Sequence, residues 1–198
     1  MKIIEFFKKT MNFKVQLSLL LVCVIGLGCQ FGSSPAEEEK ATFSLRFYPS
    51  TIDLNENGDI TTIKVMVDQA SRLIAVKLTV SFDPSIVEVT RVDTSGDGFI
   101  FTDAGAQAQE IENIIDNENG RVVVGIGGLL SGFTGASGSG SLAALWFKSK
   151  AVGESSINFV DANKDDLIAS VYSSSASTGW TELPIQIFNG NIVVKKAE

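Results

Sequence analysis

Histidine is absent from the 198-residue sequence, and cysteine occurs only twice. Without histidine the chain cannot form a Ser-His-Asp triad, a Cys-His pair or a histidine-ligated zinc site. Cys23 lies within an apolar N-terminal segment and Cys29 follows directly after it, so the rest of the chain has no pair of thiols that could form a disulfide. The stability of the folded part must therefore come from its hydrophobic core.

Basic residues are also few, because 16 lysines and arginines stand against 23 aspartates and glutamates, a net charge of −7. Residues 1–28 hold four of the lysines and one glutamate, which leaves 12 basic and 22 acidic residues and a net charge of −10 in the remainder. Nucleic acids and anionic polysaccharides bind proteins through clustered positive charge. Neither is therefore expected as a partner.

Residues 1–28 have the composition of an export signal peptide. Lysines precede an almost uncharged run from Val15 to Gly28, which leads directly into Cys29. The run is shorter than the roughly 20 apolar residues that span a membrane, which favours removal of the segment or anchoring by a lipid. Met11 begins a cleaner signal than Met1, because it leaves out Glu5, and is the alternative start of the chain.

The segment Gly26-Leu27-Gly28-Cys29 resembles the lipoprotein box of bacterial lipoproteins. The resemblance implies that Cys29 carries a lipid and becomes the new N-terminus, whereas plain secretion with cleavage nearby is the alternative. Gln30, in place of aspartate, implies sorting to the outer membrane in a bacterium with two membranes, with the protein facing outside or the periplasm. Residues 29–41 are small, polar and charged, so we expect a flexible linker that ends at a folded domain over residues 42–196.

From Ala41 onward, apolar residues recur with a period of two in short runs separated by Gly, Asn, Asp or Ser, which is typical of β-strands. In the clearest run, Leu73–Phe82, the even-numbered residues are all apolar and are expected to face the core. The pair Asn119-Gly120 predicts a hairpin, and a glycine- and serine-rich loop is expected at Gly127–Gly140. The predicted strands are Phe43–Phe47, Ile60–Val67, Leu73–Phe82, Ile111–Ile115, Arg121–Ile126, Leu142–Lys148, Ile157–Val160 and Ile185–Val194. Short strands without a convincing helix predict an all-β sandwich or barrel.

Three segments in order resemble cohesin domains and together span roughly residues 42 to 195. Leu73–Val89 is similar to the family's alternating strand, aromatic-Asp-Pro turn and following short strand, here with Phe82-Asp83-Pro84 at the turn. Gly140–Lys148 is similar to the strand after a glycine-rich loop, and Asn189–Val194 to the final strand. The resemblance implies a nine-stranded antiparallel jelly-roll β-sandwich without catalytic activity. It also implies a module that binds dockerin modules in assemblies degrading polysaccharides.

The resemblance further implies a partner-binding surface on the outer face of one sheet. Many cohesins carry Asn and Asp where this chain has Ala75 and Lys77, and an acidic residue near Leu129, so a familiar dockerin helix would lose hydrogen-bond partners here. Leu129 and its neighbours could make a more apolar contact instead. The partner is therefore expected to be an unusual dockerin or another protein. The partner-binding residues implied are Ala75, Lys77, Thr79, Ser81, Leu129, Leu130 and Phe133.

A carbohydrate-binding lipoprotein is the alternative function. Trp146 alternates with apolar neighbours and is expected to face outward, and with Trp180 it could form a platform for a sugar ring. The other interpretation, which we favour, is that each ring covers an edge of the sandwich.

Two further patterns carry little functional signal. Asp161, Asn163 and Asp165 occupy positions 1, 3 and 5 of a calcium loop, but the glycine and glutamate that such loops need later are missing. We therefore favour an ordinary turn and expect no cofactor, with calcium as the alternative. Glu110, Glu112 and Asp116 lie close together, but their spacing singles out no glycosidase pair, so no enzyme is expected.

Overall fold

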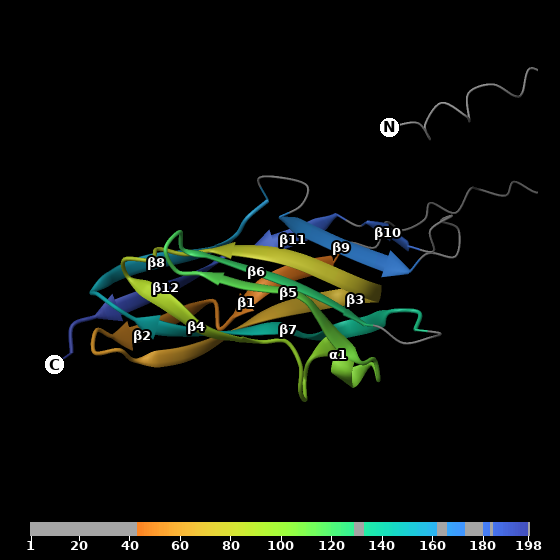
Figure 1. Cartoon of the computed structure of the whole chain (residues 1–198), viewed down its shortest axis with the longest axis horizontal. Coiled ribbons are helices and arrows are strands. Elements are labelled where there is room, and N and C mark those ends of the chain that lie inside the picture. Colours follow the sequence, from red (N-terminus) through yellow and green to blue (C-terminus); the bar gives the residue numbers. More distant parts are fainter. Residues whose placement is uncertain (1–42, 129–132, 162–165, 173–179, 183, 198) are drawn as a thin grey trace, which may run out of the picture. The chain divides into compact units, whose positions relative to one another are not determined.

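The computed structural model describes residues 43–128, 133–161, 166–172, 180–182 and 184–197. These residues form twelve strands and one helical turn (Figure 1). Within them, no helix is both long and apolar enough to cross a membrane. The elements are β1 (Phe43–Tyr48), β2 (Thr51–Asn55), β3 (Ile60–Ser81), β4 (Val87–Asp93), α1 (Ile100–Asp103), β5 (Ala108–Asp116), β6 (Arg121–Gly128), β7 (Ala136–Ser149), β8 (Gly153–Phe159), β9 (Leu167–Tyr172), β10 (Trp180–Glu182), β11 (Ile185–Phe188) and β12 (Gly190–Lys195).

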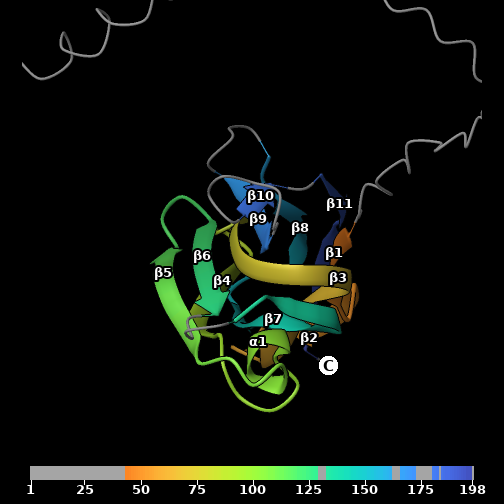
Figure 2. The same ribbon diagram turned by 90° about the vertical axis from the view of Figure 1, so that its right-hand side faces the viewer.

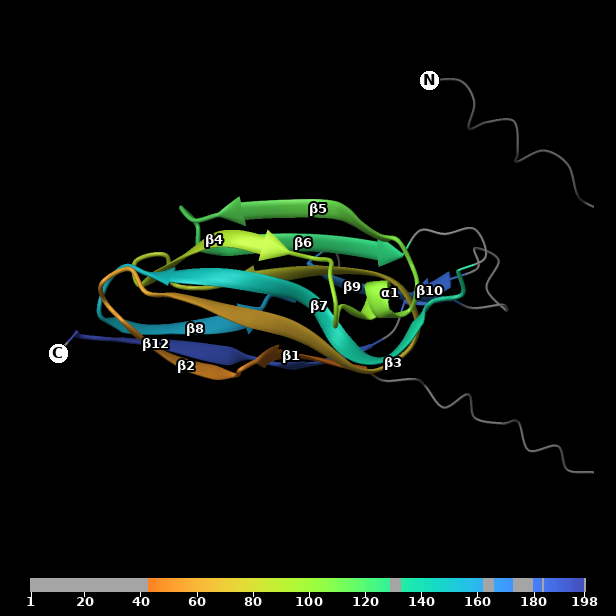
Figure 3. The ribbon, with the colours of Figure 1, turned by 90° about the horizontal axis from the view of Figure 1, so that it is seen from below.

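The 22-residue strand β3 belongs to both layers of a β-sandwich. Its first half pairs with β1 and β7, and its second half pairs with β6 and β9. One layer therefore runs β5-β6-β3-β9-β10 and the other β4-β7-β3-β1-β11, with β8, β12 and β2 completing the structure. Figures 2 and 3 both place β5 and β6 on the side of the molecule opposite to β1.

The prediction of two separate strands at Ile60–Val67 and Leu73–Phe82 was wrong, because β3 continues through the residues between them. Gln69 and Arg72 there have positive φ angles of 60° and 57°, and the pairing with β7 shifts register on both sides of Ala70. The hydroxyls of Ser139 and Ser137 accept hydrogen bonds from the backbone N–H groups of Gln69 (3.2 Å) and Arg72 (2.9 Å). The irregular part of β3 is thus held by β7.

The predicted loop at Gly127–Gly140 was also wrong in part, because β7 already begins at Ala136. Gly135, directly before β7, must be small because a Cβ there would overlap the backbone of Arg72, and Ser137 and Ser139 within β7 accept the hydrogen bonds of the irregular part of β3. The beginning of β7 therefore has the composition of a loop although it is a strand, because it pairs with the irregular part of β3.

The predicted sandwich is confirmed, but the expected antiparallel arrangement of nine strands differs from the one described. The first and last strands pair in parallel, as β1 with β11 and β2 with β12. Pro49-Ser50 and Asn189 interrupt these two runs, so that each counts as two strands. The strands at β2, β9 and β10 were not predicted from the sequence.

Alternate side chains of both layers fill one hydrophobic core, as the period-two pattern predicts. Phe47 stacks on Phe159 with ring centroids 4.3 Å apart, and Phe82 meets Phe147 edge to face at 5.7 Å. The expected inward position of Ile74 was wrong: Leu73 is buried and Ile74 is only half-buried. A register shift between Leu73 and Ala75 in the pairing with β9 reverses the alternation at this point.

Two turns at one end of the sandwich contact each other. The Asp83 carboxylate accepts hydrogen bonds from the Ser85 hydroxyl (2.6 Å) and backbone N–H (2.9 Å), which lower the pKa of Asp83. The hairpin between β5 and β6 is confirmed, and Asn119 donates through its side chain and its backbone to Asp116, which lowers the pKa of that carboxyl. The backbone N–H of Phe82 donates to the carbonyl of Gly120 at 2.9 Å and joins the two turns.

Asn117, in the same hairpin, closes the open edge between the two layers. Its side chain accepts a hydrogen bond from the N–H of Val89 (2.8 Å) and donates one to the carbonyl of Val89 (2.9 Å). It thereby substitutes for a neighbouring strand at the free edge of β4. The edge strand is protected and the two layers are joined by one side chain.

Gly120→Ala is expected to destabilise the domain strongly. Its φ is +63°, and a Cβ would overlap the carbonyl oxygen of Phe82 and the Pro84 ring. We expect a loss of about 3 kcal/mol in the free energy of unfolding, measured by chemical denaturation. The matched control is Gly98→Ala, which has a similar φ of +80° but no atom within 4 Å of the added Cβ, and should lose only about 1 kcal/mol. Equal losses in the two variants would contradict the contact between the turns.

Candidate functional site

The outward side of β5, β6, the second half of β3, and β9 forms a continuous surface, here named the β5–β9 face. Its residues follow from the strand register. Val123 of β6 points outward, since Val122 and Val124 on either side belong to the core cluster. The rows across the face are Gln109, Gly127, Ala75 and Ser170; then Glu112, Gly125, Lys77 and Ile168; then Ile114, Val123 and Thr79; and then Asp116, Arg121 and Ser81.

Two glycines form the floor of the β5–β9 face, and isoleucines form its rim. A Cβ at Gly127 would lie 3.3 Å from Cδ1 of Ile111, and one at Gly125 would lie 3.2 Å from Cβ of Glu112. The side chains of β5 therefore lie against bare backbone of β6. Ile111 is 65% exposed and Ile114 is 49% exposed, so the rim offers apolar surface to a partner.

The charges on this face are largely paired. The Lys77 ammonium lies 2.9 Å from the Glu112 carboxylate, across Gly125, and the Arg121 guanidinium lies 2.5 Å from the Asp166 carboxylate. Asp116, whose pKa is lowered by the turn, adds a further negative charge. A shallow hollow of about 250 Å³ lies among Lys77, Glu112, Ile114, Asp116, Arg121 and Val123. The face is thus close to neutral on an acidic chain, and a partner need not be strongly basic.

The structure places the predicted partner-binding residues unevenly. Ala75, Lys77 and Ser81 are half-buried on the β5–β9 face, but Thr79 is fully buried beside Val123, so the prediction that it contacts a partner was wrong. Its position in the middle of the sheet, between larger side chains, covers it. The residues Leu129 and Leu130 lie outside the described part of the chain.

Phe133, another predicted partner-binding residue, is partly buried. Its ring is half-buried against the core, with its centroid 6.4 Å from that of Phe101. It covers the end of the sandwich near Gly128, where a Cβ would meet the ring. Phe133 therefore packs on the core with one side, and a partner contact through its exposed part stays a prediction.

The isoleucine rim was not predicted from the sequence. The pairing of β5 with β6 shifts register between Glu110 and Glu112, and the extra residue, Ile111, lies outward together with Glu112. One sign of the rim was present in the sequence. Ile111 and Ile114 are three residues apart among charged and polar residues, and strict alternation in a half-buried strand would not place both on one face.

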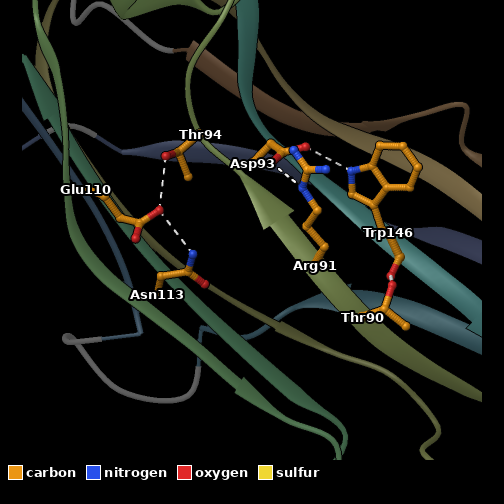
Figure 4. A network of polar contacts seen from close by, with 7 residues as sticks. All are labelled: Thr90, Arg91, Asp93, Thr94, Glu110, Asn113 and Trp146. Atoms are coloured by element: carbon orange, nitrogen blue, oxygen red, sulfur yellow. Dashed lines mark hydrogen bonds and ion pairs between the residues drawn. The ribbon is translucent and has the colours of Figure 1, made fainter.

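Trp146 points outward but is covered. Its indole N–H donates to the Asp93 carboxylate at 3.0 Å, and the Arg91 guanidinium lies 5.4 Å from the centre of the ring (Figure 4). Arg91 is held there by an ion pair of 2.6 Å with the same Asp93. Trp146 therefore packs on the outer side of β7, between β3 and β4, and not at an edge of the sandwich as the favoured interpretation had it. Trp180 begins β10, but its side chain lies outside the described part of the structure.

The candidate acidic sites have separate roles. Glu110 accepts hydrogen bonds from Thr94 (3.1 Å) and Asn113 (3.0 Å) between β4 and β5 (Figure 4). Asp161 is exposed, whereas Asn163 and Asp165 lie outside the described residues. Among the residues that the structure describes, no three or more acidic or cysteine side chains are grouped to hold a metal ion.

The fold is that of cohesin domains. A type I cohesin, the seventh of ScaB from Pseudobacteroides cellulosolvens, has a TM-score of 0.59 and 15% identity, over 79% of this chain and 94% of the cohesin. The third cohesin of ScaC from Acetivibrio cellulolyticus, solved in complex with the ScaB dockerin, has a TM-score of 0.56 and 20% identity, over 79% and 99%. A non-cellulosomal cohesin from the archaeon Archaeoglobus fulgidus has a TM-score of 0.54 and 16% identity, over 79% and 93%.

No protein-family model and no curated protein matches the sequence. At the identities above, the likeness establishes the fold, and the partner must be argued from the residues of this chain.

Thr79→Val is expected to stabilise the domain. The Thr79 hydroxyl is buried without a hydrogen-bond partner among the described residues, and valine has nearly the same shape without the polar group. We expect a gain of about 1 kcal/mol in the free energy of unfolding. Thr90→Val is the control, because the Thr90 hydroxyl donates to the Trp146 carbonyl at 3.2 Å and its removal should give no gain. A loss of stability in Thr79→Val would show that the hydroxyl is bonded.

Proposed function

We propose that this domain is a non-catalytic binding module that captures a dockerin-type module of a secreted protein on the β5–β9 face. One observation carries the proposal: an exposed, isoleucine-rimmed and nearly neutral surface lies on one sheet of a fold shared with cohesins. One of those cohesins was solved with its dockerin bound. The absence of histidine supports a binding role over a catalytic one.

The surface favours an apolar contact at its centre and rim. Ala75 offers no hydrogen bond, and Lys77 is already engaged by Glu112 across the glycine floor. Ile111 and Ile114 can bury their side chains only against a partner, and a few well-buried side chains of this kind give most of the binding free energy of an interface. The partner is therefore a dockerin-type module that presents aliphatic side chains where this rim meets it.

We also propose that the module is exported and held at the cell envelope by a lipid on Cys29. The export signal and the lipoprotein box support the anchor, and the polar linker up to residue 41 would hold the domain away from the lipid. In this position the module would retain a secreted enzyme near the cell, as part of polysaccharide degradation.

Ile111→Glu should strongly weaken capture of the dockerin-type partner. A carboxylate on the rim would have to be desolvated in the interface, so we expect binding to weaken about 30-fold or more, which corresponds to about 2 kcal/mol. The dockerin modules encoded by the same genome would be immobilised one by one, and binding of the full chain in detergent measured by biolayer interferometry. The matched control is Ile60→Glu, since Ile60 is 57% exposed but lies in the first half of β3, away from the face.

Equal weakening by the two variants would point to a general loss of folding. If no dockerin module binds, or if Ile111→Glu binds as well as the parent chain, the β5–β9 face is not the docking surface.

Cys29→Ser should release the protein from the membrane fraction. We expect the parent chain to incorporate labelled fatty acid and to sediment with membranes, and the variant to do neither. Cys23→Ser is the control, because this cysteine lies inside the signal and should leave lipid labelling unchanged. Lipid labelling that persists in Cys29→Ser would rule out the anchor at this residue.

A further inference from the structure

We infer that a hollow beside β1 and β11 binds a neutral sugar, on the side of the molecule opposite to β5 and β6 (Figures 2 and 3). The ligand class is an uncharged β-linked hexopyranose whose hydroxyls are equatorial. This site is independent of the docking face and of Trp146.

Two exposed aromatic rings border the hollow. Tyr48 is 60% exposed and Phe188 is 49% exposed, and they are the exposed aromatic side chains in the described part of the chain. Phe188 is paired with Arg46 across the two parallel strands, and Tyr48 follows two residues later on the same side of β1. The hollow has a volume of about 370 Å³ and is lined by Arg46, Phe47, Tyr48, Pro49, Ser50, Phe188 and Asn189.

The polar groups beside the rings are held in position. Arg46 donates from Nε to Asp68 at 2.6 Å and from Nη2 at 3.4 Å, and its guanidinium lies 5.7 Å from the centre of the Tyr48 ring. A guanidinium has five N–H donors, so this pairing leaves donors that can reach a ligand hydroxyl. The Asn189 side-chain oxygen accepts from the backbone N–H of Phe159 at 3.1 Å, which leaves its NH₂ group as a second donor.

This combination fits a sugar better than an ion or a large apolar ligand. The C–H groups of an all-equatorial pyranose form an apolar face that packs on an aromatic ring, while its hydroxyls lie at the edge, where Arg46 and Asn189 offer donors. Asp68 neutralises the charge of Arg46, and the chain is acidic, so an anionic ligand is not favoured. The volume lies at the lower end of the range of about 300–1,000 Å³ for small-molecule sites, which suits one or two sugar rings.

The contrast with Trp146 supports the choice of site. The ring of Trp146 is occupied by Arg91, whose guanidinium lies 5.4 Å from its centre, and only part of it is exposed. Arg46 likewise lies over the Tyr48 ring, 5.7 Å from its centre, but that ring is 60% exposed, so a sugar can pack on the surface that Arg46 leaves uncovered.

The test is native affinity electrophoresis of the full chain in detergent, through gels that contain hydroxyethyl cellulose, β-glucan, galactomannan or pectin. We expect retardation by hydroxyethyl cellulose or β-glucan, whose glucose units carry equatorial hydroxyls, and none by galactomannan, whose mannose and galactose units carry axial hydroxyls, or by the anionic pectin. The double variant Tyr48→Ala, Phe188→Ala should weaken the interaction about tenfold or more. Ile60→Ala is the matched control, since it removes a similarly exposed apolar side chain elsewhere and should leave the retardation unchanged.

Circular dichroism and thermal unfolding of the double variant establish that it is folded, which we expect because both rings lie on the surface. Migration unaffected by both hydroxyethyl cellulose and β-glucan, or retardation that is equal in the parent and the double variant, would overturn the inference. The Ile111→Glu variant should keep the sugar interaction, so failure of this site and failure of the docking face are distinguishable.

Discussion

The pairing of one strand, β3, with partners in both layers is the constraint on which the sandwich depends. Its 22 residues pass from the layer of β1 and β7 to the layer of β6 and β9 without a loop. The passage requires positive φ at Gln69 and Arg72, and the backbone N–H groups at these residues need acceptors because the regular ladder is broken. Ser137 and Ser139 provide those acceptors, which accounts for these two serines in the neighbouring strand.

The second half of β3 lies near the centre of the β5–β9 face, so the same strand that joins the layers also supports the candidate docking surface. Small residues at Gly125 and Gly127 let the side chains of β5 lie against the backbone of β6, and a register shift places Ile111 and Glu112 on the same side. The ion pair between Lys77 and Glu112 then crosses the glycine floor. Since such a pair is partly exposed, its effect is on the complementarity of the surface more than on stability.

Polar side chains protect the edges where the sandwich would otherwise be open. Asn117 bonds to both backbone groups of Val89 at the edge of β4, and Glu110 accepts from Thr94 across the same gap. Asp93 and Arg91 cover Trp146 on the adjoining sheet. Exposed apolar and aromatic surface is thus left mainly at the rim of the β5–β9 face and at the hollow of Tyr48 and Phe188, where binding would cover it.

The sequence by itself determined the all-β class, the core alternation in β1 and in most of Leu73–Phe82, the Asp83-Pro84 turn and the hairpin at Asn119-Gly120. Each of these depends on local preference and on a period of two, which neighbouring residues reveal. Only the tertiary structure decided that β3 is continuous, that Thr79 is buried, and that Ile111 lies outward while Ile74 does not reach the core. The continuity of β3 and the positions of Ile74 and Ile111 depend on register shifts between strands distant in sequence, since one residue of shift exchanges the two faces of a strand, and the burial of Thr79 depends on larger side chains that neighbouring strands place around it. For the same reason no local pattern could place Tyr48 beside Phe188, since their strands pair across the whole length of the domain.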